Sequence, residues 1–216
     1  MGFDIYGLNP HNPKKLVKPT IDWSKQHTEE EKDIYFKSID YYESQVPGHY
    51  FRNNVWWWRP LWDYIYTYTN CLSEKDWKSG HHNSAYQIDG ETSIRIATKL
   101  HELIDSKHAK EHEEMLDVKA KAAKKHNKEI EDKCEIIKQI VIEKNQQKYI
   151  KLGYSGQELE DKREEFIAPM DYPKKEKEMW DKLQAEKDWS DSYPFSVENV
   201  REFANFCYQS GGFEIC

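Results

Sequence analysis

The sequence predicts a mainly helical α+β protein in which a small terminal-strand element packs on helices and an extended, charged helical insertion lies within the chain. Three observations predict this class. Short segments of alternating apolar and polar residues lie at both ends, apolar residues recur at helical spacing between them, and one long stretch is rich in lysine and glutamate. We therefore expect a compact domain from residues 1–105 and 190–216, with residues 106–189 as a helical hairpin or coiled-coil-like insertion.

The two ends of the chain have matching strand patterns. Phe3 and Ile5 alternate with Asp4 and Tyr6 near the N-terminus, and residues 213–215 repeat the alternation near the C-terminus. An antiparallel pair with one apolar face buries that face on a core and leaves the other in water. We therefore expect the two ends to pair in a small sheet.

Capping residues and apolar spacing predict the helices of the compact domain. Thr28 and Glu31 form a capping box, which predicts a helix to about Glu43. Pro60 is expected in the first turn of the next helix, where its missing N–H costs nothing. Further helices are expected after the cap Ser73, from Glu91 with Ile94 and Ala97 on the apolar face, and from the cap Ser196 to Gly211.

The insertion differs in composition from the rest of the chain. Residues 106–189 contain 19 Lys and Arg against 20 Asp and Glu, a balance of about −1. Its apolar residues follow a narrow seam, typical of a helical hairpin or coiled coil, through Ile130, Cys134, Ile137 and Val141. The insertion is expected to form a homo-oligomer or to fold back as a hairpin, and a solvated spacer is the structural alternative.

Composition argues against several classes of function. The net charge is −7 and no long basic block occurs, so binding of duplex nucleic acid is not expected. No apolar run approaches the roughly 18 residues that span a bilayer, so no membrane association is expected. The cysteines Cys71, Cys134, Cys207 and Cys216 form no CxxC pair. Their wide spacing, with no secretory signal, indicates reduced thiols in a cytoplasm, and we expect no metal and no cofactor.

Residues 50–62 form the segment that is richest in tryptophan and arginine. Three consecutive tryptophans cannot all face one core, because side chains turn by about 100° per residue on a helix and alternate on a strand. At least one indole is therefore expected to be exposed or to line a cavity. Indole rings beside guanidinium and amide groups suit a flat, charged, nucleotide-like ligand. The candidate ligand-binding residues here are Tyr50, Arg52, Asn53, Asn54, Trp56, Trp57, Trp58, Arg59 and Trp62.

Each of these residue types also has a structural alternative. The tryptophans could form a core cluster, since aromatic side chains dominate buried area. Arg52 and Arg59 could each pair with a carboxylate such as that of Asp63, instead of clamping a phosphate or carboxylate from two points. Asn53 and Asn54 could cap the following helix instead of binding a base or ribose.

A glycine-led loop adds His81, His82 and Asn83 to the candidate ligand-binding residues. Two adjacent histidines without a third ligand in register are a weak metal signal, so no metal is expected there. Either histidine could act as a general acid or base with a nearby carboxylate, but spacing identifies no partner. The chain contains no Walker loop, GxSxG elbow, HExxH or GxGxxG motif. We therefore expect no catalytic residue, and a binding protein in preference to an enzyme.

Four blocks of the sequence resemble a family of uncharacterised small proteins that are common in bacteriophages and prophages. The blocks are MGFDIYGLNP at residues 1–10, YFRNNVWWWRPLW at 50–62, YPFSVENV at 193–200 and SGGFEIC at 210–216. They cover roughly a third of the chain and keep their order. Many relatives have a CxxC zinc-ribbon-like insertion between the second and third blocks. This chain has the charged helical region there instead, so a metal role is not carried over.

The resemblance supplies no activity but implies a phage setting, with the protein in the host cell cytoplasm. Small phage proteins often antagonise host defence, and some sequester nucleotide immune signals. With the aromatic segment, this setting predicts a small-molecule-binding protein that acts as a sponge for a nucleotide signal. Two alternatives stay open. One is a nucleotide-processing hydrolase or transferase, and the other is a protein-binding inhibitor of a host factor that uses the tryptophans as interface anchors.

Overall fold

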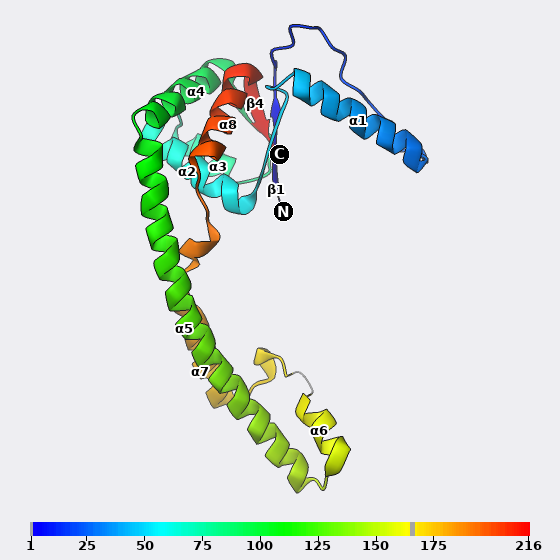
Figure 1. Cartoon of the computed structure of the whole chain (residues 1–216), viewed down its shortest axis with the longest axis vertical. Coiled ribbons are helices and arrows are strands. Elements are labelled where there is room, and N and C mark those ends of the chain that lie inside the picture. Colours follow the sequence, from blue (N-terminus) through cyan, green and yellow to red (C-terminus); the bar gives the residue numbers. More distant parts are fainter. Residues whose placement is uncertain (1, 165–166) are drawn as a thin grey trace. The chain divides into compact units, whose positions relative to one another are not determined.

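The computed structural model describes residues 2–164 and 167–216 and shows a mainly helical α+β protein with a small antiparallel sheet (Figure 1). The chain divides into two units. The compact unit comprises Met1–Leu116 and Tyr193–Cys216, and the hairpin unit comprises Asp117–Ser192. None of the described helices is both long enough and apolar enough to cross a membrane.

The compact unit contains a four-stranded antiparallel sheet in the order β2-β1-β4-β3. The strands are β1 Gly2–Gly7, β2 Tyr50–Asn54, β3 Tyr86–Asp89 and β4 Gly212–Ile215. The predicted pairing of the two ends is confirmed, because Ile5 lies opposite Ile215 in the register of β1 and β4. The sequence patterns did not predict β2 and β3, which pair with β1 and β4 and so complete the sheet.

Among the described residues, five helices belong wholly to the compact unit. They are α1 Glu29–Gln45, α2 Val55–Thr69, α3 Glu74–Gly80, α4 Gly90–Asp105 and α8 Val197–Ser210. The predicted capping box of α1 is present, with Thr28 Oγ1 accepting from the Glu31 N–H and the Glu31 carboxylate accepting from the Thr28 N–H. Ser73 and Ser196 also cap their helices as predicted, and Gly211 ends α8 in the left-handed conformation with φ of 61°.

The prediction that Pro60 opens a helix is wrong, because α2 begins five residues earlier, at Val55. Asn54 explains the difference. Its side-chain oxygen accepts hydrogen bonds from the backbone N–H groups of Trp56 and Trp57, at 3.0 and 3.1 Å, and so caps the helix there. Pro60 therefore lies inside α2, where it leaves the carbonyl of Trp56 without its usual helical donor.

The buried face of α4 is rotated from the predicted one. Ala97 is buried as expected, but Ile94 is 49% exposed, and Ile96 and Leu100 face the core instead. Ser93 accounts for part of this rotation. It is fully buried because its hydroxyl donates to the Cys207 carbonyl of α8 at 2.8 Å, which turns that side of α4 toward α8.

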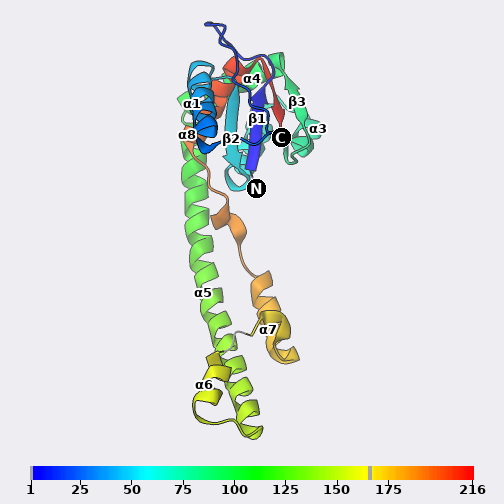
Figure 2. The ribbon, with the colours of Figure 1, turned by 90° about the vertical axis from the view of Figure 1, so that its right-hand side faces the viewer.

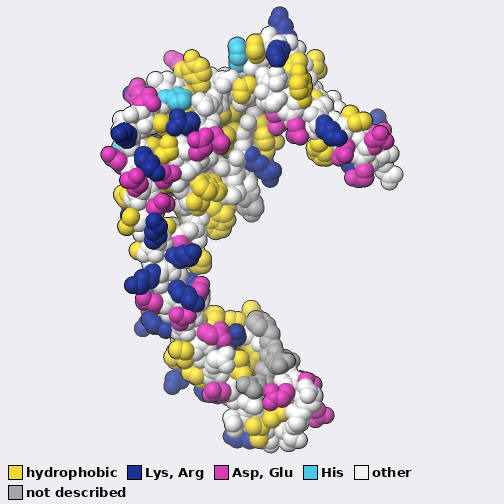
Figure 3. Space-filling view, viewed as in Figure 1, with side chains coloured by type: hydrophobic (Ala, Val, Ile, Leu, Met, Phe, Trp, Pro, Cys, Tyr) yellow, Lys and Arg dark blue, Asp and Glu magenta, His cyan; other side chains and the backbone are white. Residues whose placement is uncertain are grey.

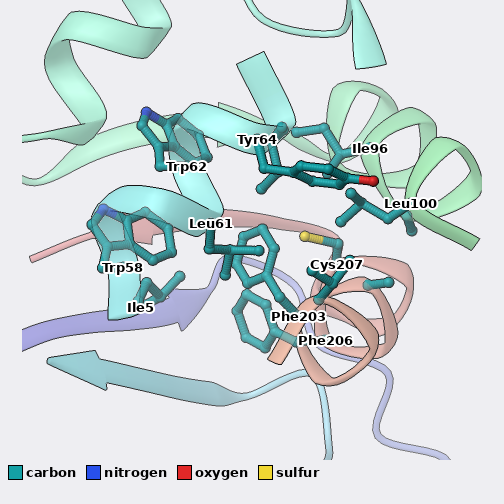
Figure 4. Close-up of a cluster of buried hydrophobic side chains, with 14 of the residues drawn as sticks. Ile5, Trp58, Leu61, Trp62, Tyr64, Ile96, Leu100, Phe203, Phe206 and Cys207 are labelled. Atoms are coloured by element: carbon teal, nitrogen blue, oxygen red, sulfur yellow. The ribbon is translucent and has the colours of Figure 1, made fainter. Parts of the chain in front are cut away.

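The core of the compact unit lies between one face of the sheet and three helices. Figure 4 shows side chains from α2, α4 and α8 in one cluster with Ile5 of β1. Phe3, Ile5, Phe213 and Ile215 are at most 4% exposed and complete this core from the sheet. The opposite face of the sheet presents the polar residues Asp4, Tyr6, Tyr50, Arg52, Gln87 and Glu214.

The hairpin unit is built on the long helix α5, His108–Lys151, of which the residues from Asp117 onward belong to this unit. It also contains α6 Gly156–Glu164, α7 Lys174–Ala185 and two short 3₁₀ turns, η1 Pro169–Asp171 and η2 Trp189–Ser192. Figure 2 shows α7 beside α5. The predicted seam on α5 is buried, since Ile130, Cys134, Ile137 and Val141 are 1–4% exposed.

Polar bonds fix α7 and the segment after it along α5. Asn127 of α5 donates to the Asp188 carbonyl at 2.7 Å and accepts from the Asp188 N–H at 3.0 Å. Farther along the same helix, Lys144 pairs with the buried carboxylate of Glu176 at 2.8 Å. The hairpin unit therefore holds its own antiparallel helix pair.

Candidate functional site

The aromatic segment splits into residues that build the core and residues that face solvent. Trp58 and Trp62 are 0% exposed, and their rings stack at a centroid distance of 5.2 Å. Both indole N–H groups are satisfied within the protein, because Trp58 Nε1 donates to the Gly80 carbonyl at 2.7 Å and Trp62 Nε1 to the Trp77 carbonyl at 3.1 Å. These two tryptophans match the structural alternative, and Trp57 is half-buried.

The two asparagines of the segment have structural partners. Asn54 is the N-cap of α2, as the structural alternative proposes. Asn53 is 9% exposed, and its side-chain N–H donates to the side-chain oxygen of Asn199 at 2.9 Å. This bond joins β2 to α8, so the amide of Asn53 holds two elements of the fold together.

Trp56 is the tryptophan of the segment that is most exposed to solvent. Its side chain is 46% exposed and contacts Tyr193 at a centroid distance of 5.2 Å. Arg59, one helical turn later on the same exposed face, donates from Nη1 to the Tyr193 hydroxyl at 3.4 Å. An indole, a phenol and a guanidinium group therefore share one patch of surface at the start of α2.

The same face of α2 continues to a carboxylate that binds a histidine. Asp63 Oδ1 accepts from Trp77 Nε1 at 2.6 Å and lies 3.0 Å from His81 Nε2. We call this surface the α2 face and define it by six residues: Trp56, Arg59, Asp63, Trp77, His81 and Tyr193. Spacing could not identify the Asp63–His81 pair because the two residues lie 18 positions apart, on different elements.

The electrostatics of the α2 face favour an ionised Asp63. Partial burial opposes ionisation, but the hydrogen bonds from His81 and Trp77 and the positive charge of Arg59 outweigh it and lower the pKa of the Asp63 carboxyl. An ionised carboxylate can only accept a hydrogen bond, so Nε2 of His81 is the donor in its contact with Asp63. The Trp77 ring, 5.2 Å away and perpendicular to the imidazole, fixes its orientation.

The rest of the histidine loop has different surroundings. His82 is exposed, and Asn83 donates from its side chain to the Gly2 carbonyl at 2.9 Å, so it ties the loop to the start of β1. Of the three loop residues predicted for the site, the structure brings His81 to the α2 face through its bond with Asp63.

Tyr50 and Arg52 belong to the outer face of the sheet. Both contact Asp4, with the Tyr50 hydroxyl donating to Oδ1 and Arg52 Nε lying 3.5 Å from the same oxygen. Burial and the bond to Asp4 raise the pKa of Tyr50 well above its usual range. Arg52 and Arg59 therefore lie on different elements with different partners, and the structure does not bring them together as a two-point clamp.

Metal-binding groups are dispersed in the part of the chain that the structure describes. Within residues 2–164 and 167–216, no three His, Cys, Asp or Glu side chains gather as a metal site requires. The four cysteines are free thiols.

Comparisons with known proteins return no relatives. No family model matches the chain, no curated protein is similar to it, and no solved structure matches its fold. Functional inference for this chain therefore depends on the chemistry of its own surfaces.

Proposed function

We propose that the compact unit binds a nucleotide-like small molecule on the α2 face and holds it without turnover. The observation that supports this proposal is the half-exposed indole of Trp56 beside Tyr193, with the Arg59 guanidinium next to both rings. A planar base stacks on such a ring, and a phosphate pairs with such a cation.

The chemistry of the patch leaves its groups available to a ligand. The bond from Arg59 to Tyr193 is long, at 3.4 Å, and joins a cation to a neutral phenol. A phosphate offers a shorter, charge-assisted bond, so Arg59 gains by turning toward it. Stacking of a base on Trp56 contributes roughly 1–3 kcal/mol. Asp63, farther along α2, and His81, which follows α3, provide an acceptor and a ring nitrogen that can bind polar edges of the ligand.

The resemblance to phage proteins suggests what such binding achieves. A protein that binds a nucleotide signal and holds it unchanged lowers the free concentration of that signal in an infected cell. This sponge function requires affinity and abundance and requires no catalytic group. Recovery of the ligand in chemically unchanged form is thus the property that separates a sponge from an enzyme.

Isothermal titration calorimetry against cyclic mononucleotides, cyclic dinucleotides and ADP-ribose tests the proposal. We expect one of these classes to bind, and Trp56→Ala to weaken that binding about 5- to 150-fold, the range that corresponds to the loss of one stacking contact. Arg59→Gln should also weaken binding. The matched controls are Trp189→Ala, an exposed tryptophan of the hairpin unit, and Arg52→Gln on the sheet, and both should retain affinity. The proposal would be contradicted if Trp189→Ala weakened binding as much as Trp56→Ala, or if Arg52→Gln weakened it as much as Arg59→Gln.

The Asp63–His81 pair favours a second candidate, a nucleotide-processing hydrolase or transferase. A histidine whose Nε2 proton is held by a carboxylate can act as a general base through Nδ1. Chromatography of the ligand recovered after heat denaturation distinguishes the two functions, because a sponge returns intact ligand. Conversion that stops in His81→Gln and Asp63→Asn would establish the enzyme instead.

Failure of all these nucleotides to bind would favour the third possibility, a protein-binding inhibitor. Exposed Trp, Tyr and Arg side chains are the residue types that anchor protein interfaces. A stoichiometric host protein that wild-type chain captures and Trp56→Ala does not would then replace the nucleotide proposal.

A further inference from the structure

Helix α5 has a second stripe of heptad-spaced residues, in which isoleucines alternate with charged and polar side chains and two of the isoleucines are exposed. Its positions recur at alternating spacings of three and four residues, which is the heptad pattern of a coiled-coil seam. The stripe contains Glu129, Lys133, Ile136, Ile140, Glu143, Gln147 and Ile150. Ile136 at its centre is 61% exposed and Ile150 is 45% exposed.

This stripe is separate from the seam that α5 buries within the hairpin unit. The buried seam includes Cys134, Ile137 and Val141, which pack against α7 and Tyr172. One helix with two heptad seams can pack against two neighbours at once. The chain supplies α7 for the first seam, whereas Ile136 and Ile150 of the second seam stay exposed.

Ile136 and Ile140 of the stripe also line a hollow between α5 and α7. The hollow has a volume of about 420 Å³ and is lined by Ile136, Ile140, Met179 and Leu183, with charged residues at its rim. Met179 is 45% exposed. Figure 3 shows how lysine and acidic side chains alternate over the surface of the hairpin unit, with apolar side chains reaching the surface among them.

Two charged residues flank the exposed isoleucines symmetrically. Lys133 lies three residues before Ile136, and Glu143 lies three residues after Ile140. Neither charge has an ion-pair partner in the described chain. Nearby charges do have partners at 3.0–3.2 Å, in the pairs Lys128–Asp132 and Lys138–Glu135.

This symmetry points to a second copy in antiparallel orientation as the partner. When two copies of α5 run in opposite directions, Ile136 meets the partner's Ile140, and Lys133 meets the partner's Glu143, twice in the interface. A parallel pair would instead place Lys133 against the partner's Lys133 and Glu143 against the partner's Glu143. Like charges in facing positions are unfavourable, so the charge pattern selects the antiparallel pair.

We propose that the protein forms an antiparallel homodimer in which the α5 stripe of each copy packs into the α5–α7 hollow of the other. Two isoleucine layers form the centre of this interface, and a Lys133–Glu143 pair lies on each side of it. The hairpin unit thereby assembles four helices, two from each copy, and a dimer presents two α2 faces to ligand. The proposal is independent of what the α2 face binds.

Sedimentation velocity over a concentration series tests this assembly. Wild-type protein should shift from monomer toward dimer with rising concentration. Lys133→Glu alone and Glu143→Lys alone should each weaken the dimer by roughly 10-fold or more, because each places like charges in two facing pairs. An equal mixture of these two variants should dimerise again, since every facing pair in the mixed dimer is then complementary. The double variant Lys133→Glu with Glu143→Lys should dimerise like wild type.

The control is Lys124→Glu, a charge reversal at an exposed position on another side of α5, which should leave the dimer unchanged. Far-UV circular dichroism confirms that each variant keeps its helices. Wild-type protein that stays monomeric at about 1 mM, where even an association with a Kd of 1 mM is visible, would overturn the proposal. A dimer whose dissociation constant is changed by neither Lys133→Glu nor Glu143→Lys would overturn it as well.

Discussion

The division of the aromatic segment predicts opposite results for two neighbouring tryptophans. Replacing Trp58 removes a ring that stacks on Phe3 at 5.5 Å and on Trp62 at 5.2 Å, in the centre of the core. Replacing Trp56 removes a ring that is almost half exposed. The same substitution, to alanine, should therefore strongly destabilise the protein at position 58 and leave its stability nearly unchanged at position 56.

The expected magnitudes follow from burial and hydrogen bonding. Truncation of a fully buried aromatic residue to alanine costs about 3–5 kcal/mol. Loss of the Trp58 indole N–H also leaves the buried Gly80 carbonyl without its donor, which costs about 1–3 kcal/mol more. Because a domain of this kind has a total stability of about 5–15 kcal/mol, Trp58→Ala removes a large part of it. Trp58→Phe keeps one ring and should cost about 1–3 kcal/mol.

Urea denaturation followed by far-UV circular dichroism measures these free energies of unfolding. Trp58→Phe should retain a folded baseline and a measurable transition even if Trp58→Ala does not. Trp56→Ala should stay within about 1 kcal/mol of wild type. An unchanged midpoint for Trp58→Phe, or equal losses for Trp56→Ala and Trp58→Ala, would refute the division into core and surface tryptophans.

Three further predictions concern the compact unit. Gly80→Ala should lower the melting temperature markedly, because an added Cβ would lie 2.3 Å from the buried ring of Trp62; a thermal melt that matches wild type would show that the ring can move. Deleting residues 211–216 removes β4, whose Phe213 and Ile215 side chains are 0% exposed, and should lower the melting temperature sharply in calorimetry. The pKa of Asp63 is lower in the folded protein than in the unfolded chain, so ionised Asp63 stabilises the fold above the unfolded pKa of about 4, and this stabilisation is lost as the pH falls below that value. Asp63→Asn should therefore make stability depend less steeply on pH in the acid range. Identical pH profiles for the variant and the wild type would exclude this contribution.

Local patterns predicted much of the fold. The terminal strands, the capping box of α1 and the buried seam of α5 depend on residues close in sequence, and all three are present in the structure. The extent of α2 was predicted wrongly because two start signals compete there. The side-chain oxygen of Asn54 caps the helix, so α2 begins at Val55. The preference of Pro60 for the first turn of a helix therefore does not set where α2 begins.

The candidate site was harder to predict because its contacts join distant parts of the chain. Tyr193 contacts Arg59 across 134 positions, and its sequence neighbourhood contains no sign of that contact. Asp63 was an isolated acid in the sequence until the structure paired it with His81. The separation of Trp58 from Trp56 depends on the rotation of α2 against the sheet, which residue types alone do not determine.

The most direct test of the α2 face follows the indole N–H signals of the eight tryptophans by ¹H–¹⁵N NMR during titration with the nucleotide that binds. Trp56→Phe assigns one signal by its loss, and Trp189→Phe assigns a control signal. Binding on the α2 face predicts that the Trp56 signal shifts most, while the signals of Trp58 and Trp62 stay nearly in place. A titration in which the Trp56 signal does not move while other signals do would contradict the proposed site.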